Sequence, residues 1–495
     1  MTSPSCDLRI AIESECVANV RHANALVGQP RLVIVTNGLK DCRGHHYETA
    51  IAVAEAAAEA RLTPILAPHV DCRADLVPSW LTSVPTFRTE YWSAATGPRA
   101  RVRTALDKAL PRLPACAAEA VGWALDQRAR WRRLTADRRE AASATKAAAK
   151  IASDEASIEV FRSDLRRLLT QLKVGAADHV YLPTTHGREL VAVRRLLDEL
   201  SATDCPTFHL EFRNPLFLGA RAPDDAASSG DAEPWPLVAH EHQLWFQLYR
   251  ELGVSDRVLL YTDAEPLSRE YERVAQLPLA VLPVPFRSRL LQPQTRDAGA
   301  PLRLTYLGEP RDDKGFHWLP ALMQQLWGDD ACRGRVELHC QASMASPSVN
   351  PRSIAARRRL ERYPRDWVRW YGQTGPLSAE AYYELLTQAD IVLFPYEPAR
   401  YQTATSGTFA EALAAGKPTV VPAGTWLASQ QPAGSGEVFV DRQSFVDCVY
   451  QAIAGYDTYR QRAAAFAPQF LAWHTPSRLV EQLIQGSPAP RRQAS

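Results

Sequence analysis

The sequence lacks the features that mark membrane-spanning, secreted and nucleic-acid-binding proteins. No stretch approaches the length of about 18 apolar residues that suggests a membrane span. Its 57 Lys and Arg residues nearly balance its 55 Asp and Glu residues, and the basic residues are dispersed. Charge therefore gives no reason to expect nucleic acid as a partner. Residues 1–19 carry charges where a signal peptide needs an apolar centre, which argues against secretion by that route.

The spacing of the cysteines does not indicate a disulfide framework. The chain contains no C-x-x-C pair, and an odd, scattered set of cysteines in a chain of this length is typical of reduced thiols. The nine cysteines lie at positions 6, 16, 42, 72, 116, 205, 332, 340 and 448. We therefore expect a cytoplasmic protein without a disulfide framework.

The chain is long enough for two domains. Its 495 residues exceed what one ordinary core holds. Short apolar runs alternate with helical segments on both sides of a polar stretch at 288–300, which we interpret as a linker. The sequence thus predicts an α/β protein, with one doubly wound domain over 1–287 and a second over 301–475. A closing helix from Pro476 to Gln485 and a flexible tail occupy 476–495.

The predicted first domain contains a segment of different amino-acid composition, at about 98–173. This segment is rich in Ala, Arg, Glu and Leu, and it has little Gly or Pro after Pro114. The summed helix propensity predicts long helices, which we interpret as a hairpin inserted into the first domain. Its Arg-rich piece, Arg128 to Arg133, is explained either by a solvated helix face or by contact with a membrane or partner surface.

The most informative stretch runs from Ala389 to Pro422. An apolar run, Ile391 to Phe394, predicts a buried strand, and Ser406-Gly407-Thr408 after a polar loop predicts the start of a helix. A flexible loop that leads into a helix N-terminus offers unpaired N–H groups and the positive end of the helix dipole. These features suit a phosphorylated ligand, although Ser and Thr also favour this position as helix caps.

Three segments of the second domain resemble a known family. They are YLGEPRDDKGF from Tyr306, DIVLFPY from Asp390 and SGTFAEALAAGKPTVVP from Ser406. Together they are similar to the donor-binding half of GT-B glycosyltransferases of the group 1 (family 4) type. The resemblance implies two Rossmann-like doubly wound domains that face a cleft, with the acceptor on the first domain and the nucleotide-sugar on the second. It also implies that the last helices pack back across the first domain.

The sequence departs from the family pattern at two positions. Thr403 stands where the family usually has the first Glu of an E-x7-E motif, and Glu309 stands where it usually has Arg. Lys314 and Arg311 still follow a predicted strand, at the edge where open α/β sheets bind ligands. A diphosphate leaving group needs cations and N–H donors. We therefore predict that both residues bind the donor phosphates. The alternative interpretation is that they belong to a solvated turn.

Two further donor residues follow from the resemblance. The family places the nucleotide base against the loop after the strand Val368 to Tyr371, which makes Gly372 a donor-binding candidate. The second motif glutamate corresponds to Glu411 and implies a carboxylate that accepts hydrogen bonds from ribose hydroxyls. An alternative is that Glu411 reaches back to the Thr408 N–H in a capping box and only starts the helix.

Histidines mark candidate positions in the first domain. The resemblance implies that the loop after the first strand borders the cleft, which places Gly44, His45 and His46 there. An ordinary strand–helix turn is the alternative. On the strand Pro206 to Phe212, His209 shares one face with Glu211 and Arg213. These three side chains either line the cleft or lie at a wet edge of the sheet.

The sequence therefore predicts transfer of a sugar from a nucleotide-sugar to an unidentified glycan, lipid-linked or small-molecule acceptor. The resemblance implies retention of configuration, and no Asp/His cluster is placed to hold a metal, so we expect no metal and no cofactor besides the donor. A lipid-linked acceptor would bring peripheral contact with a membrane. The alternatives are a phosphorylase or nucleotide-sugar epimerase on the same architecture, or a non-catalytic nucleotide-sugar binding module.

Overall fold

The computed structural model divides the chain into two compact units. Unit 1 comprises 1–93, 140–286 and 474–495, and unit 2 comprises 94–139 and 287–473, so the chain passes between the units four times. The structure describes residues 29–41, 45–89, 109–134, 140–218, 236–292, 296–297, 299–341, 343, 350–373 and 375–486.

Unit 1 is built on a seven-stranded parallel sheet. Its strands are β1 (Arg31–Thr36), β2 (Thr63–Pro68), β3 (Thr82–Ser83), β4 (His179–Leu182), β5 (Thr207–Glu211), β6 (Val258–Thr262) and β7 (Ala280–Val281). They lie in the order β3-β2-β1-β4-β5-β6-β7, and each of these neighbouring pairs is parallel. The order reverses direction between β1 and β4, which is the switch point of a doubly wound sheet.

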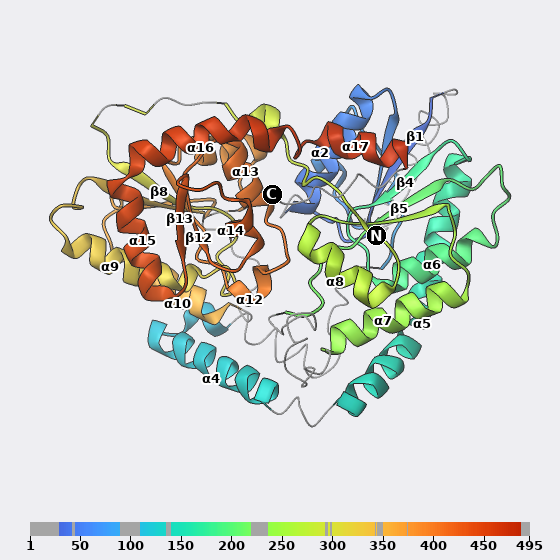
Figure 1. Ribbon diagram of the computed structural model, residues 1–495, viewed down its shortest axis with the longest axis horizontal. Helices are drawn as coiled ribbons and strands as arrows, with labels where there is room; N and C mark the ends of the chain where they lie inside the picture. Colours follow the sequence, from blue (N-terminus) through green and yellow to red (C-terminus); the bar gives the residue numbers. More distant parts are fainter. Residues whose placement is uncertain are drawn as a thin grey trace, which may run out of the picture. The chain divides into compact units, whose positions relative to one another are not determined.

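Helices cover both faces of this sheet. On one face, α2 (His45–Glu59) and α17 (Pro476–Gln485) pack with strand side chains in one core cluster. Figure 1 shows α17, in red, beside α2. On the other face, Phe212 at the end of β5 packs against Phe246 of α7 (Leu237–Glu251) and Tyr271 of α8 (Glu265–Ala275). The short helix η1 (Ala74–Leu76) follows β2.

The predicted closing helix therefore has the expected bounds, and it belongs to unit 1. Thr475 caps its first turn by accepting a hydrogen bond from the Arg478 N–H, and Pro476 occupies the first helical position. Leu479, Val480 and Leu483 are buried against α2. The last helix thus closes the core of the first domain, as the family resemblance implied.

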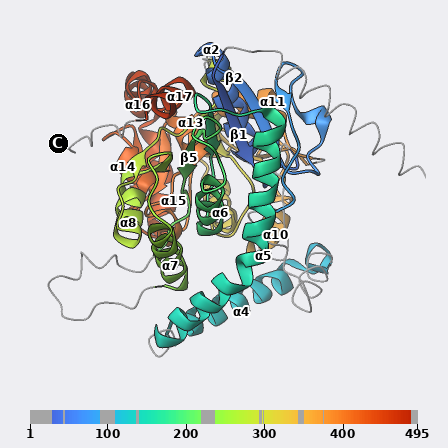
Figure 2. The same ribbon diagram turned by 90° about the vertical axis from the view of Figure 1, so that its right-hand side faces the viewer.

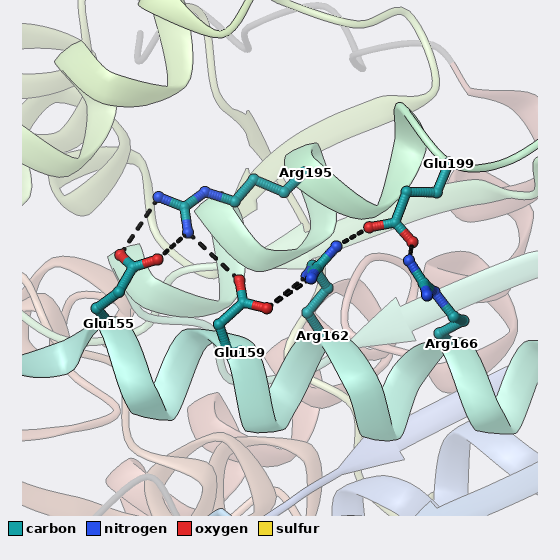
Figure 3. Close-up of polar contacts among 6 residues, drawn as sticks. All are labelled: Glu155, Glu159, Arg162, Arg166, Arg195 and Glu199. Atoms are coloured by element: carbon teal, nitrogen blue, oxygen red, sulfur yellow. Dashed lines mark hydrogen bonds and ion pairs between the residues drawn. The ribbon is translucent and has the colours of Figure 1, made fainter.

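The long helix α5 (Glu140–Leu172) lies against α6 (Gly187–Leu197) and α7, and Figure 2 shows it as one continuous helix alongside α6. Ion pairs join α5 to Arg195 of α6 and to Glu199, which lies two residues after the end of α6. In Figure 3, Arg195 bonds Glu155 and Glu159, and Glu199 pairs with Arg162 and Arg166. No helix of the described ranges, α5 included, is long and apolar enough to cross a membrane.

Unit 2 repeats the doubly wound plan with six strands. They are β8 (Leu302–Tyr306), β9 (Val336–Gln341), β10 (Val368–Tyr371), β11 (Ile391–Leu393), β12 (Thr419–Pro422) and β13 (Gly436–Phe439). Their order is β10-β9-β8-β11-β12-β13, and all pairings are parallel. The switch point lies between β8 and β11. The predicted α/β class with two doubly wound domains is confirmed.

The helices of unit 2 bury the sheet in the same way. One core cluster joins strand side chains to α9 (Leu319–Gly328), α10 (Pro351–Leu360) and α15 (Arg442–Ala454). Outside this cluster, α13 (Gly407–Ala414) packs against α16 (Tyr456–Leu471). Unit 2 also contains α11 (Ala379–Gln388), α12 (Pro398–Tyr401) and α14 (Trp426–Gln430), with short turns η2 (Leu110–Arg112), η5 (Ser288–Leu290) and η6 (Phe316–Trp318).

The predicted insertion at 98–173 is divided between the two units. Its second half, α5, belongs to unit 1, but α4 (Ala115–Leu134) belongs to unit 2 and packs against α10. Small side chains explain this contact, because Ala118 lies in a cluster with Ile354 and Ala355. A Cβ atom on Gly122 would lie 2.6 Å from Arg352 Cγ, so glycine permits the close approach. A single hairpin on the first domain was therefore the wrong interpretation.

Candidate functional site

The two loops that leave the switch point of unit 2 converge. One loop runs from Leu307 to Gly315 after β8, and the other follows β11 and leads through α12 to α13. Gly315 has φ +65°, and a Cβ atom there would lie 1.7 Å from the carbonyl oxygen of Pro395. Only glycine fits this position, so the first loop lies directly against the second. This convergence is the position at which open α/β sheets bind ligands.

Lys314 extends into this region as an unneutralised cation. Its ammonium group lies 5.4 Å from the centre of the Tyr396 ring, and it forms no hydrogen bond or ion pair with any described residue. Burial, and next the positive charge of Arg311, lowers the pKa of Lys314 to about 8. The carboxylates of Asp313, Glu309 and Glu411 oppose this lowering, but none of them forms an ion pair with the ammonium group.

Gly308 lies close to both Lys314 and the start of α13. A Cβ atom on Gly308, whose φ is +91°, would lie 3.0 Å from Lys314 Nζ and 3.8 Å from the Thr408 hydroxyl oxygen. The Gly308 N–H donates to Gln341 Oε1 at 2.7 Å, which fixes the loop. The predicted donor residues Lys314 and Thr408, 94 positions apart in the sequence, therefore lie around one glycine.

The N-terminus of α13 has the predicted form. Ser406 is the N-cap, and its hydroxyl accepts a hydrogen bond from the Phe409 N–H at 3.3 Å. No acceptor among the described residues pairs with the N–H groups of Gly407 and Thr408. The space around the Gly407 Cα is open, since apart from its chain neighbours and the backbone of its own helix no atom lies within 4 Å of a Cβ placed there. These two N–H groups can donate to an anion.

Arg311 already has a carboxylate partner. Its Nη2 donates to Asp313 Oδ2 at 2.9 Å and to the Tyr401 hydroxyl at 3.1 Å, and Arg400 Nε lies 3.0 Å from the same carboxylate oxygen. The Arg311 Nε is buried and has no hydrogen-bond acceptor among the described residues. Arg311 thus belongs to the same region, with one donor group left over and a charge that Asp313 partly neutralises.

Asp312 and Asp313 point to different partners. The Asp312 carboxylate accepts hydrogen bonds from the N–H and hydroxyl of Ser353, each at 2.7 Å, at the start of α10. This position stabilises the helix through its dipole. Burial raises the pKa of Asp312, although the bonds from Ser353 oppose the rise. No three His, Cys, Asp or Glu side chains come together as a metal site in the described part of the chain.

The capping-box alternative for Glu411 is wrong. Because Ser406 caps α13, Glu411 is the fifth residue of the helix rather than the third after a cap. Its carboxylate, 7% exposed, accepts hydrogen bonds from the hydroxyls of Tyr382 and Tyr383 of α11, the second at 3.0 Å. Its role toward a ribose stays a prediction. Gly372 follows β10 with φ +71°, a conformation that suits glycine in a tight turn.

Unit 1 has a different set of groups at its switch point. Glu211 at the end of β5 is fully buried and accepts a hydrogen bond from the Tyr181 hydroxyl. Arg213 donates to Asp263 Oδ2 at 2.8 Å and lies 3.7 Å from Glu211 Oε1. Burial raises the pKa of Glu211, although Arg213 opposes the rise. The cation of this cluster is therefore matched by two carboxylates.

His46 lies beside this cluster at the start of α2. Burial, followed by the charge of Arg213 and the neighbouring His186, lowers the pKa of His46 to about 4, so its imidazole is neutral near pH 7. His186 is the N-cap of α6, and its Nε2 is 3.3 Å from the Asn214 side-chain nitrogen. His45 begins α2, and Gly44 lies outside the described residues.

Buried polar groups without a partner adjoin the same switch point. Asn37 Nδ2, Thr184 Oγ1 and Glu211 Oε1 have no hydrogen-bond partner among the described residues. Strands β1 and β4 pair with Ile34 opposite Tyr181, so Asn37 and Thr184, three residues further along each chain, leave the sheet side by side. Unsatisfied buried groups are rare in native structures and point to a missing ligand or water.

His209 is not a cleft residue. Its side chain is fully buried, stacks on His179 with ring centres 5.2 Å apart, and bonds the Tyr261 hydroxyl at 3.2 Å. The period-two argument correctly placed His209 on the face of Glu211, but α2 and α17 cover that face and exclude it from solvent. Tyr382, Tyr383, Gly308 and Gln341 were not predicted, since nothing in the local sequence of a helix or turn marks such distant partners.

Comparisons with known proteins show the class of fold. No protein-family model and no curated protein matches the sequence. Solved structures of GT-B glycosyltransferases match over nearly the whole chain, so this chain has the GT-B fold. The sequence identities lie well below 25%, and the similarity therefore concerns the fold.

Three matching structures illustrate the similarity. Sucrose-phosphate synthase from Thermosynechococcus elongatus is 14% identical, covers 92% of this chain and 98% of its own, and has a TM-score of 0.53. HepE from Anabaena, in complex with UDP and glucose, is 11% identical, covers 92% and 99%, and has a TM-score of 0.52. The E. coli trehalose-6-phosphate structure bound with UDP-2-fluoro glucose is 12% identical, covers 93% and 100%, and has a TM-score of 0.55.

Proposed function

We propose that this protein is a glycosyltransferase that takes a sugar from a nucleotide-sugar donor bound at the switch point of unit 2. The observation that carries the proposal is Lys314, an ammonium group without an anionic partner among the described residues, beside the free N–H groups that start α13. Among the matching structures, Anabaena HepE is in complex with UDP and glucose, which supports a uridine diphosphate donor here.

These groups suit the charge that develops during transfer. When the bond between the sugar and the diphosphate breaks, negative charge grows on the leaving phosphate oxygens. Lys314 supplies a positive charge, and the N–H groups of Gly407 and Thr408 supply fixed donors that need no rearrangement. Arg311 adds one donor group beside them. Retention of configuration and independence from metal ions remain predictions of this proposal.

We assign the acceptor to the switch point of unit 1. Asn37 Nδ2, Thr184 Oγ1 and Glu211 Oε1 are buried and accept or donate no hydrogen bond among the described residues, although Glu211 Oε1 lies 3.7 Å from Arg213 Nε. A hydroxyl-bearing acceptor can supply hydrogen bonds to such atoms. His46 lies beside them in its neutral form. We expect Asn37→Ala and Thr184→Val to reduce transfer while leaving the affinity for the donor nucleotide unchanged.

The test uses the full chain and a panel of UDP-, GDP- and ADP-sugars. Calorimetry measures binding of each donor, and nucleotide release is followed with and without candidate acceptors. We expect one nucleotide to bind and its release to accelerate with an acceptor. The Lys314→Met variant should bind that nucleotide at least about tenfold more weakly, as expected when a charged hydrogen bond is lost. The absence of binding by the whole panel would refute the proposal.

A second candidate is a binding module without transferase activity. Thr403 favours this possibility, because it is a buried residue at the position where the resembled family usually carries a glutamate. This candidate predicts donor binding that depends on Lys314 but no release of nucleotide with any acceptor or with water. The same panel therefore separates the two candidates.

A further inference from the structure

The donor loop, as we name residues 307–315 after β8, is fastened to α10 by Asp312. The Asp312 carboxylate accepts hydrogen bonds from the Ser353 N–H and hydroxyl, each at 2.7 Å, and from the Arg352 N–H at 3.2 Å. The Asp312 N–H in turn donates at 3.1 Å to the side-chain oxygen of Asn350, the residue before α10. Asn350 and Ser353 are buried. The donor loop is therefore bonded to the start of α10 in both directions.

Helix α4 contacts the same end of α10. A Cβ atom on Gly122 of α4 would lie 2.6 Å from Arg352 Cγ, so α4 lies directly against the first turn of α10. Farther along the Arg352 side chain, Nε lies 3.7 Å from Asp312 Oδ2, and Nη1 lies 3.5 Å from His317 Nε2. The Arg352 side chain thus extends from α4 to Asp312 in the donor loop and to His317 just after it.

The contact between α4 and α10 is separate from the main core of unit 2. Helix α10 contributes Ala356 and Leu360 to that core. It contributes Ile354 and Ala355 to a small second cluster, which contains Ala118 of α4. Figure 1 shows α4, in cyan, beside α10. Helix α4 therefore adds a layer outside α10 and is not part of the core that covers the sheet.

Packing alone explains this layer poorly. Among residues 115–124 of α4, the buried ones are Ala118 and Gly122, which are small and gain little free energy from burial. Ordering a helix costs conformational entropy at every residue. In addition, residues 94–139 belong to unit 2 although the chain reaches them from unit 1 and returns to unit 1 after them.

We propose that α4 positions the donor loop: by packing on the start of α10 it holds the helix end to which Asp312 is bonded, and it thereby fixes Lys314 for the donor diphosphate. This inference rests on the proposed function. Gly122 and Asp312 are positioning residues, because they act through α10 and the backbone of the donor loop. The donor site of unit 2 consequently depends on a segment whose two ends continue into unit 1.

The direction of one effect separates positioning from charge. Removing the Asp312 carboxylate takes a negative charge away from the region in which the diphosphate is proposed to bind, so electrostatics alone predicts tighter binding. Loss of the attachment predicts the opposite, because Lys314 is then no longer held for the phosphates. Weaker binding by Asp312→Ala therefore supports the positioning role.

The experiment measures binding of the tightest of UDP, GDP and ADP to the full chain by calorimetry. Asp312→Ala should weaken binding by at least about tenfold, similar to the loss of one charged hydrogen bond. Asp312→Asn keeps an oxygen that can accept from Ser353 and should bind more tightly than Asp312→Ala. Gly122→Leu should separate α4 from α10 and weaken binding by about three- to tenfold.

Lys314→Met provides the second axis of a double-mutant cycle. If α4 and Asp312 act through Lys314, Gly122→Leu and Asp312→Ala should each weaken binding by less than about twofold in the Lys314→Met background. Ala120→Leu is the matched control, because Ala120 lies on the same helix but is exposed, and it should leave binding unchanged. If Gly122→Leu does not fold, Gly122→Ala places a smaller group at the same contact and should give the same pattern with a smaller loss.

Three outcomes count against the inference. Equal losses of affinity with and without the Lys314 ammonium group would show that α4 and Asp312 only stabilise the fold of unit 2. Unchanged or tighter binding by Asp312→Ala and Gly122→Leu would overturn the inference and leave the proposed function standing. Failure of the parent protein to bind any of the three nucleoside diphosphates would overturn the proposed function, and the inference with it.

Discussion

The two units share one topology but carry opposite electrostatic arrangements at the same place. In each sheet the strand order reverses between the first and fourth strands of the unit, and polar side chains gather where those strands end. At this position unit 2 offers Lys314, which has no ion pair in the described residues, whereas unit 1 holds Arg213 between Glu211 and Asp263. The switch point of unit 2 therefore has a positive charge available to bind an anion, whereas the switch point of unit 1 does not.

This difference shows what the fold supplies and what the side chains supply. A doubly wound sheet fixes where a ligand can bind, because ligands of open α/β sheets bind beyond the carboxyl ends of the strands at the switch point. The ligand class follows from the charges and from the unpaired groups on those loops. A phosphorylated ligand is expected at unit 2, and a ligand that offers hydroxyl groups is expected at unit 1.

The largest effect is expected for Arg213→Met in unit 1. Removing the cation leaves two buried carboxylates without an ionic partner, and breaking a buried pair in this way costs about 3–5 kcal/mol. We expect the melting temperature to fall by about 6 °C or more. Arg400→Met is the control, since Arg400 also pairs with a carboxylate but is 46% exposed, and exposed pairs contribute little. Equal melting temperatures for the two variants would mean that the Arg213 cluster is not a buried structural network.

The second effect concerns Lys314→Met in unit 2. Loss of a charged hydrogen bond costs about 1.5–3 kcal/mol, so affinity for the donor nucleotide should fall by about 10- to 150-fold without loss of thermal stability. Lys417→Met is the matched control. Lys417 is also half-buried, and its pKa is also lowered to about 8, but its Nζ donates to the Thr387 carbonyl at 2.6 Å. If both variants bind nucleotide equally well, Lys314 has no role in phosphate binding.

The third effect is a pH dependence of nucleotide binding. Burial and Arg311 lower the pKa of Lys314 to about 8, so the free protein loses this charge above that pH. An anion binds the protonated form better, and affinity should therefore be constant between about pH 7 and 8 and fall up to about tenfold per unit above it. Lys314→Arg keeps its charge throughout and should remove the dependence. A parent protein with flat affinity up to pH 10 would contradict the assignment.

The smallest effect is expected from chelation of divalent metals. The proposal assigns the diphosphate charge to Lys314, Arg311 and the start of α13, so an excess of EDTA should change donor affinity and turnover by less than about twofold. Full inactivation that magnesium or manganese reverses would contradict this assignment. Asp313 would then need re-examination, because the Asp312 carboxylate is occupied at the start of α10.

Most of the secondary structure could be predicted from the sequence. Short apolar runs bounded by Gly and Pro correspond to buried parallel strands, and the predicted Val368–Tyr371 has the observed bounds of β10. The closing helix Pro476–Gln485 and the cap at Ser406 were also found, because caps and proline act locally. The two-residue strand β3 was missed, since it is too short to show a pattern.

Within the candidate site, the sequence indicated Lys314, Arg311 and the start of α13, because a loop after a strand and a helix N-terminus are local features. Only the tertiary structure decided which groups are paired. Asp313 pairs with Arg311 and partly neutralises its charge, and the Asp312 carboxylate bonds Ser353 at the start of α10. Glu411 is bonded to two tyrosines, and His209 is buried under two helices. The tertiary structure also placed α4 with unit 2 through the small residues that contact α10. These outcomes depend on side chains that are far apart in the sequence, and the local periodicity of the sequence does not identify such partners.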